Sequence, residues 1–201
     1  ELERDALDAR LHLLQRQVAP HFLFNTLANV QALIDIGSPK AADLMRSLIA
    51  YLRAAVPRLH EPTTTLGEEL ALVRAYLELM YMRMPDRLQY AIETDASLHA
   101  VRCPTLTLLT LVENAVKHGI DPAEDGGRIV IRIWRDAGRC RLRVEDSGAG
   151  LGASAHGLGT GLSTLRDRLA LSFGAGAELQ VAAHLPHGTR ADIGFPLAAD
   201  A

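Results

Sequence analysis

Apolar positions recur at helical spacing over the first 84 residues, with breaks at proline and glycine. A first stripe alternates four and three residues apart, as in a coiled-coil seam, and consists of Leu7, Leu11, Leu14 and Val18. Pro20 removes a backbone donor and predicts a kink or a new helix start. The next stripe ends at Gly37-Ser38-Pro39 and consists of Leu23, Leu27, Val30 and Ile34.

Two further helices are predicted before residue 85. One ends at Pro57, and its apolar side consists of Ala41, Leu44, Leu48, Leu52 and Ala55. The other begins at about Leu66 and ends at Pro85, and its stripe consists of Leu70, Val73, Leu77, Met80 and Met84. Because a helical hairpin cannot bury two apolar faces by itself, we expect an all-α dimerisation hairpin that forms a four-helix bundle as a homodimer.

The period of the pattern changes after Pro85. Leu88, Tyr90 and Ile92 alternate as in a half-buried strand, and a helix is expected from Pro104 to His118. Two alternating runs on either side of Asp136-Ala137-Gly138 predict a β-hairpin. A helix from about 162 to 173 and two final strands follow. Because strands and helices do not strictly alternate, the pattern predicts an α+β sandwich with helices on one face of a mixed sheet.

Composition narrows the possible functions. A formal net charge of -3 gives no sign of a surface for nucleic acid or anionic membrane. Cys103 and Cys140 lie far apart without CxxC spacing, which argues against a disulfide framework or a zinc site. No apolar run reaches the roughly 18 residues of a membrane span. The charged start without Met leads us to expect a fragment of a longer protein.

The segment Pro20-His21-Phe22-Leu23-Phe24-Asn25 is the first that suggests chemistry. On a helical wheel of about 100° per residue, His21 and Asn25 lie close together, opposite the apolar stripe. A neutral imidazole is a nucleophile near neutral pH, so an accessible His21 could form a covalent intermediate. By spacing alone, a surface or core histidine remains the simpler interpretation.

A polar cluster lies in the predicted helix that ends at His118. Glu113, Asn114, Lys117 and His118 are one, three and four residues apart, and these spacings gather them along one side of a helix. Mg²⁺ prefers oxygen ligands together with phosphate oxygens, and lysine supplies a point charge for phosphates. The cluster fits a magnesium–nucleotide site, although an exposed polar stripe explains it as well.

Two glycine-rich turns add to the candidate chemistry. Asp146 follows an apolar strand, where its carboxylate can accept a hydrogen bond from an exocyclic amine, and Gly148 and Gly150 would let backbone approach a flat base. The second turn opens a helix, whose N-terminal N–H groups and dipole favour phosphate. This turn contains Gly157, Gly159, Gly161 and Leu162. It is neither a Rossmann fingerprint nor a Walker A loop.

Together and in this order, the segments resemble the sensor histidine kinases of the LytS type. PHFLFN resembles their phosphoacceptor motif, and the stretch from TLGEEL to Arg83 resembles their connector. LVENAVKHG resembles the N box of the Bergerat (GHKL) ATPase fold, and EDSGAG and GLGTGLSTLRDRL resemble its two glycine boxes. Gly188-Thr189-Arg190 resembles the last nucleotide-contacting turn. The similarity covers nearly the whole chain from about Leu14.

The resemblance implies that ATP phosphorylates His21 and that an aspartate of a response regulator then receives the phosphoryl group. Glu113 would orient or activate the attacking group, and Asn114 would ligate Mg²⁺. From its place beside His21, we hypothesise that Asn25 positions water for the reverse, phosphatase step. The implied ATP contacts are Asn114, Lys117, His118, Asp146, Gly148, Gly150, Gly157, Gly159, Gly161, Leu162 and Thr189.

The resemblance also implies an organisation for the chain. Residues 1–62 would form the coiled-coil entry and the dimerisation and histidine-phosphotransfer helices, residues 63–85 a connecting helix, and residues 86–201 the catalytic ATP-binding domain. The partners would be a second copy and a response regulator of the LytTR type, without direct nucleic-acid binding. The segment would be the cytoplasmic part of an inner-membrane sensor, attached through a region that precedes it.

Two departures from the family pattern concern Thr110 and Thr164, where the family commonly has proline and asparagine. Neither removes a group that would ligate metal or adenine. Two other functions remain open: a GHKL ATP-binding module with a non-histidine output, and a degenerate nucleotide-binding dimerisation module. The PHFLFN box argues against the first, and the intact Asn114 and Asp146 argue against the second.

Overall fold

The computed structural model describes residues 20–57, 61–150 and 160–197, and it divides into two compact units. The first unit ends at Glu61 and the second begins at Pro62, one residue before the expected boundary. The seam expected over residues 7–18 lies outside the described residues. Among the helices that are described, none combines the length and apolar character that crossing a membrane requires.

The first unit contains a helical hairpin of α2 (Pro20–Asp35) and α3 (Lys40–Ala55). The ring of Phe22, near the start of α2, meets the ring of Tyr51, near the end of α3, edge to face at 5.8 Å. The two helices are therefore antiparallel. Gly37 joins them with a φ of +66°, a conformation that glycine adopts without strain. The predicted hairpin is confirmed.

The face of α2 that packs on α3 matches the predicted stripe only in part, at Val30. Thr26 and Val30, one turn apart, are buried, and the Thr26 hydroxyl donates to Phe22 O at 2.8 Å. In contrast, Leu27 and Ile34 remain exposed, and the Phe24 side chain beside them is 66% exposed. The hairpin of a single chain therefore retains a second apolar face.

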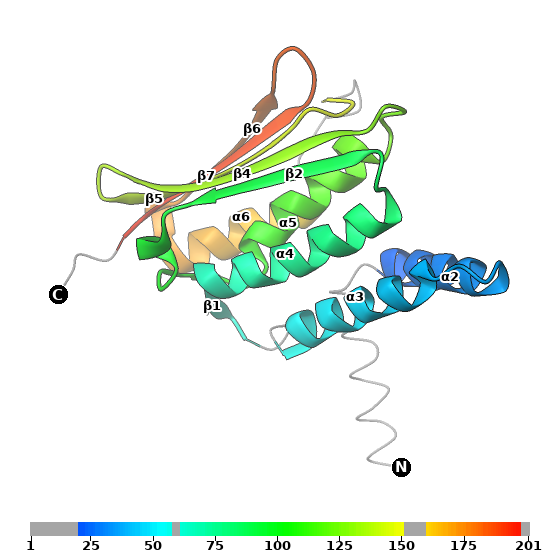
Figure 1. The fold of residues 1–201 in the computed structure, drawn as a ribbon. Coiled ribbons are helices and arrows are strands. Elements are labelled where there is room, and N and C mark those ends of the chain that lie inside the picture. Colours follow the sequence, from blue (N-terminus) through cyan, green and yellow to red (C-terminus); the bar gives the residue numbers. More distant parts are fainter. Residues whose placement is uncertain (1–19, 58–60, 151–159, 198–201) are drawn as a thin grey trace. The chain divides into compact units, whose positions relative to one another are not determined.

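The second unit is built on a five-stranded sheet with the order β2-β4-β5-β7-β6 (Figure 1). The strands are β2 (Leu88–Thr94), β4 (Gly127–Asp136), β5 (Arg139–Asp146), β6 (Glu178–Ala183) and β7 (Thr189–Pro196). β2 and β4 are parallel, and the other neighbours are antiparallel. Ala137 and Gly138 both have positive φ, as the tight turn between β4 and β5 requires.

Three helices cover one face of this sheet (Figure 1). They are α4 (Leu66–Arg83), α5 (Thr107–Asn114) and α6 (Thr160–Phe173). α6 buries Leu165 and Leu169, and the ring of Phe173 at its end stacks on Phe195 of β7 at 4.5 Å. The predicted α+β sandwich with a mixed sheet is confirmed. The segment 63–85, expected as a connector, contains α4, which packs against α5 and β2 inside this unit.

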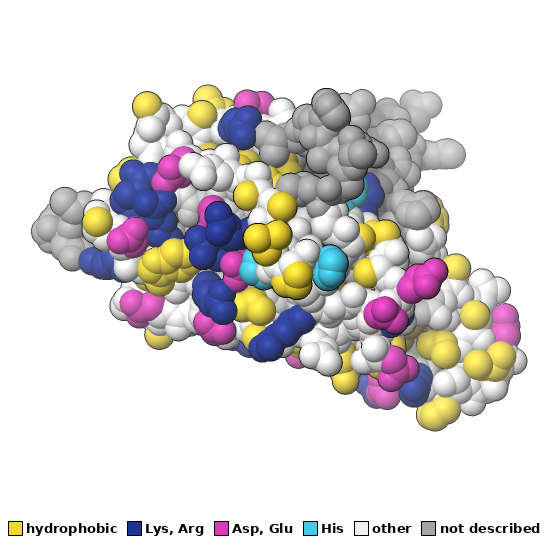
Figure 2. All heavy atoms as spheres, turned by 90° about the horizontal axis from the view of Figure 1, so that it is seen from above, with side chains coloured by type: hydrophobic (Ala, Val, Ile, Leu, Met, Phe, Trp, Pro, Cys, Tyr) yellow, Lys and Arg dark blue, Asp and Glu magenta, His cyan; other side chains and the backbone are white. Residues whose placement is uncertain are grey.

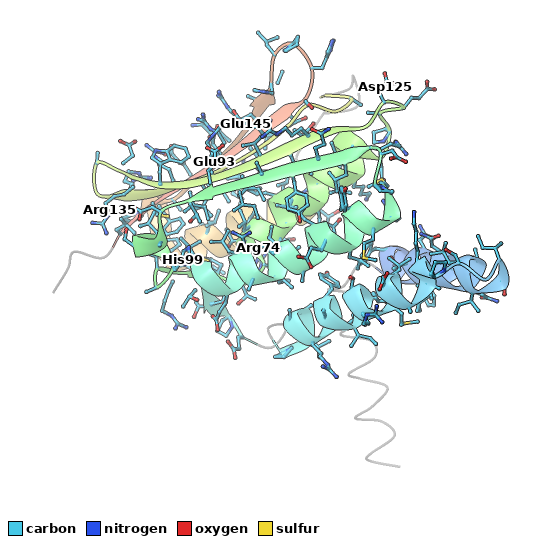
Figure 3. All side chains as sticks on the ribbon, viewed as in Figure 1. Arg74, Glu93, His99, Asp125, Arg135 and Glu145 are labelled. Atoms are coloured by element: carbon cyan, nitrogen blue, oxygen red, sulfur yellow. The ribbon has the colours of Figure 1, made fainter. Side chains whose placement is uncertain are left out.

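The other face of the sheet carries paired charged side chains (Figure 2). Arg132 of β4 bridges Glu93 and Glu145, whose positions Figure 3 labels, and Arg143 of β5 pairs with Asp192 at 2.6 Å. Arg143 also lies over the ring of Trp134. Because these charges largely satisfy one another at the surface, we interpret this face as a solvated exterior.

Several short elements were not predicted. β1 (Thr63–Thr65) pairs antiparallel with β3 (Arg102–Pro104), and the 3-10 turns η2 (Ala96–Leu98) and η4 (Gly174–Gly176) flank longer elements. The predicted helix start at Pro104 is wrong, because Pro104 ends β3 and Leu106 is left-handed with a φ of +61°. The helix begins only at Thr107.

A buried carboxylate explains this start. Glu69 of α4 is fully buried, and its Oε1 accepts a hydrogen bond from Leu106 N at 2.7 Å. Its Oε2 accepts from Leu108 N at 2.9 Å. Glu69 therefore caps α5 from another helix, because the first N–H groups of a helix have no partner within it. Burial raises the pKa of Glu69, while the backbone donors act in the opposite direction.

We expect Glu69→Gln to lower the free energy of unfolding of the second unit by about 2 kcal/mol, because an amide cannot accept from all of these buried donors. Urea denaturation followed by the fluorescence of Trp134, the single tryptophan of the chain, reports on this unit. Glu78→Gln, at an exposed position of the same helix, should change the value by less than about 0.5 kcal/mol. Equal effects of the two substitutions would contradict the capping role.

Candidate functional site

Asp146 ends β5 inside a cradle of glycines. Its side chain is buried, and its Oδ1 accepts a hydrogen bond from Gly148 N at 3.0 Å. A Cβ at Gly119 would overlap this carboxylate, and a Cβ at Gly188 would overlap the Asp146 carbonyl oxygen. A Cβ at Gly148 would overlap the Gly119 carbonyl. The three segments that contain these glycines therefore pack around Asp146 more closely than a residue with a Cβ would allow.

Burial raises the pKa of Asp146, and several neighbours act in the opposite direction. These neighbours are the backbone N–H groups of Gly148 and Thr189, the charge of His184 and the Thr189 side chain. Asp146, Gly148 and Thr189, each of which is expected from the sequence to contact ATP, therefore lie together. A buried carboxylate held by backbone donors can present its remaining acceptor capacity to an amine.

The predicted polar cluster lies where the helix changes its hydrogen bonding. α5 ends at Asn114 and continues as the π-helix η3 (Ala115–Ile120), in which Asp121 N donates to Val116 O at 2.8 Å. Glu113 and Asn114 are half-buried, whereas Lys117 and His118 are exposed. The expected single α-helix through His118 is wrong beyond Asn114. π-turns of this kind recur at functional sites.

Asn114 is oriented for oxygen coordination. Its Nδ2 donates to Thr110 O at 2.8 Å, which makes Oδ1 the amide atom available to a ligand. No group of three or more His, Cys, Asp or Glu side chains that could hold a metal ion occurs within the described ranges. This donor set fits Mg²⁺ that completes its shell with phosphate oxygens and water, because Mg²⁺ is seldom held by protein groups alone.

Glu113, the carboxylate of this cluster, has a strongly raised pKa. Burial raises the pKa of Glu113 to about 7, and the charge of Lys117 opposes the shift. The group can therefore gain or lose a proton near neutral pH, as a general acid or base requires.

The second glycine turn is described only in part. Gly157 and Gly159 lie outside the described residues, and Gly161 and Leu162 stand in the first turn of α6. Thr110, one of the departures from the family pattern, donates through Oγ1 to Leu106 O at 2.6 Å. Thr164, the other, donates to Thr160 O at 2.8 Å. Both threonine hydroxyls therefore donate a hydrogen bond to the backbone carbonyl four residues earlier.

Two glycines of the cradle were missed in the sequence. Gly119 follows the polar cluster directly, and its carbonyl accepts a hydrogen bond from Ala149 N at 2.9 Å. Gly188 was placed in the turn that resembles the last nucleotide-contacting turn but was not named as a site residue, and its φ of +118° brings it against Asp146. Glycines at the ends of motifs were the available signal in both cases.

Comparison with known proteins agrees with this geometry. Residues 9–88 match the family described as histidine kinase, and residues 104–199 match the histidine kinase-, DNA gyrase B- and HSP90-like ATPases. The chain belongs to the histidine kinase family. The sensor histidine kinase/phosphatase LytS of Staphylococcus aureus is 35% identical over 86% of this chain and 32% of its own length. The chain thus spans about a third of the curated relatives that it matches.

Solved structures show that the fold is shared with other histidine kinases. The histidine kinase domain of a blue-light-activated kinase from Erythrobacter litoralis matches with a TM-score of 0.52 at 19% identity, covering 98% of this chain and 95% of that one. The kinase ThkA, in complex with the response regulator TrrA, matches with a TM-score of 0.50 at 18% identity, covering 95% and 64%. The family resemblance is confirmed.

The raised pKa of Glu113 in this histidine kinase predicts a cost in stability. The folded state holds the proton more tightly than the unfolded state, so stability falls as the pH rises toward and through about 7. We compare the free energy of unfolding of Glu113→Gln with that of the wild type at about pH 5.5 and at about pH 8. The difference should shift in favour of the variant by about 2 kcal/mol between the two pH values.

Urea denaturation at the two pH values measures this difference. Glu124→Gln, at an exposed position after η3, is the matched control and should follow the wild type. A Glu113→Gln difference that does not change with pH would contradict the displaced pKa.

Proposed function

We propose that the chain is the catalytic core of a two-component sensor kinase that transfers the γ-phosphoryl group of ATP to His21. The observation that carries this proposal is the buried Asp146 within its glycine cradle, because it can accept a hydrogen bond from the exocyclic amine of adenine. The match to the ATPase family over residues 104–199 supports ATP as the nucleotide.

ATP would bind with its adenine against backbone and its phosphates toward the π-helix. Gly148 and Gly150 would lie under the base, beside Thr189. The exposed Lys117 and His118 would meet the phosphates, and Gly157, Gly159, Gly161 and Leu162 would supply further ATP contacts. ShkA, a structural neighbour with a TM-score of 0.50 at 20% identity, is known in complex with AMPPNP, an ATP analogue.

Asn114 would hold Mg²⁺ through Oδ1. The ion would neutralise charge on the phosphates, which is its usual contribution to phosphoryl transfer. Thr110 would assist by orienting the Asn114 amide through its backbone carbonyl.

In the transfer step, an unprotonated imidazole nitrogen of His21 would form a bond to the γ-phosphorus while the bond to the leaving oxygen of ADP breaks. The proton on the other ring nitrogen must then depart, and the carboxylate of Glu113 would orient the ring or accept this proton. A pKa of about 7 leaves part of the Glu113 population ionised at neutral pH.

The helical hairpin would form a four-helix bundle with a second copy. Support comes from the apolar side chains that α2 and α3 leave exposed, which are Phe24, Leu27, Ile34 and Ile49. Two such hairpins would bury these faces against each other, as a single hairpin cannot. The segment would lie in the cytoplasm and be carried by a membrane sensor region that precedes it.

A response regulator, which we expect to be of the LytTR type, would receive the phosphoryl group on an aspartate. ThkA is known in complex with a response regulator. LytS is a sensor histidine kinase/phosphatase, and Asn25, which is exposed one turn beyond His21, would position water for a phosphatase step in this chain. The alternative functions, a non-histidine output or nucleotide binding without turnover, would leave His21 unmodified.

Incubation with γ-labelled ATP and Mg²⁺ tests the main proposal. We expect acid-labile, base-stable label that falls to background in His21→Gln, because no other side chain would carry the phosphoryl group. His99→Gln, at an exposed histidine of the second unit, is the matched control and should retain the label. Label on serine, or no label on the wild type, would reject histidine kinase activity.

Asn25→Ala should leave this autophosphorylation intact. It should slow dephosphorylation of the phosphorylated regulator by about 100-fold, the lower range for a lost group that orients or transfers a proton. Gln31→Ala, at an exposed position of the same helix, is the control. The release of inorganic phosphate from the regulator measures the effect, and an unchanged rate for Asn25→Ala would reject the role.

A further inference from the structure

Arg83, the last residue of α4, and Arg87, in the turn that follows α4, contact the C-terminal end of η3, which continues the helix that carries the candidate nucleotide site. Nη2 of Arg87 lies within hydrogen-bond distance of three carbonyls, and its two N–H groups are shared among those of Ile120 at 3.2 Å, Asp121 at 3.0 Å and Ala123 at 2.6 Å. The last carbonyls of a helix lack partners within it, and its C-terminus attracts positive charge. Arg87 therefore satisfies the end of η3 from outside.

Arg83 reinforces the same point from the last turn of α4. Its Nη2 lies 2.6 Å from Oδ1 of Asp121, and the Arg83 side chain is only 20% exposed. A partly buried pair of this kind is screened by solvent less than an open surface pair. Both arginines thus converge on Asp121, the residue that follows η3.

The backbone of Arg87 is fixed as well. Its carbonyl accepts a hydrogen bond from Gly127 N at 2.8 Å, and a Cβ at Gly126 would overlap this carbonyl. Gly126, with a φ of +72°, permits the approach. The backbone of Arg87 is therefore bonded to the start of β4, while its guanidinium group contacts the end of η3.

The contacts of η3 lead directly to the nucleotide cradle. Gly119 lies in η3, its carbonyl accepts from Ala149 N, and its Cα position leaves no room beside Asp146. A shift of η3 would therefore move the glycine turn and the carboxylate together. From this geometry we propose that Arg87 and Arg83 are positioning residues, which hold η3 in the position that ATP binding requires. This inference rests on the ATP binding proposed above.

Isothermal titration of the full chain with ATP and Mg²⁺ tests the inference. Arg87→Ala should weaken ATP binding by about tenfold or more, the range for residues that orient a binding group. Arg83→Gln should weaken it less, because a single ion pair is lost. Arg74→Gln, at an exposed arginine of α4 labelled in Figure 3, should bind as the wild type does.

A rescue experiment separates positioning from general loss of structure. Guanidinium chloride, at concentrations below those that affect the wild type, should restore much of the ATP affinity of Arg87→Ala and should leave Arg74→Gln unchanged. If Arg87→Ala does not fold, Arg83→Gln decides the question by its ATP affinity alone. Wild-type affinity in Arg83→Gln and Arg87→Ala, or a loss that guanidinium cannot restore, would overturn the inference. Failure of the wild type itself to bind ATP would instead reject the proposed function, and this inference with it.

Discussion

The carboxylate of Glu69 at the start of α5 is the contact on which the arrangement of the second unit depends. A buried charge is costly unless it is well hydrogen bonded, and here the backbone N–H groups of Leu106 and Leu108 supply the bonds. If α4 and α5 moved apart, the carboxylate and these donors would both lose their hydrogen-bond partners. The two helices can therefore pack in essentially one register. The helix that bears Asn114 thereby receives a fixed starting point.

The far end of this helix is also tied to α4. Arg87 contacts the carbonyl end of η3 and Arg83 contacts Asp121, so α4 supplies negative charge where α5 begins, and α4 with the turn after it supplies positive charge where η3 ends. Between the two ends, η3 departs from α-helical bonding and brings Gly119 against Asp146. A nucleotide site built on a helix held at both ends needs little reorganisation on binding.

The sequence predicted the regular elements and the identity of the candidate nucleotide groups, because both depend on local patterns. Alternation around Ile131 and Leu142 revealed the hairpin, and glycines beside Asp146 suggested the approach of a base. The start of α5, the pairing of β1 with β3 and the π-helix could not be predicted, because each is set by a contact distant in sequence. Glu69, an acid on the apolar side of its helix, was the one visible signal for such a contact.

Phosphoryl transfer depends on positioning and charge more than on covalent help from the protein. In the proposed reaction, His21 belongs to one compact unit, whereas Glu113 and Asp146 belong to the other. The nucleotide site can therefore be fully formed before the imidazole of His21 reaches the γ-phosphate. Because the second unit begins at Pro62 and only the short strand β1 precedes α4, a signal that reaches α4 acts on the helix that contacts both ends of the nucleotide helix, through Glu69 and Arg83. Control of ATP binding and control of phosphoryl transfer would then share one helix.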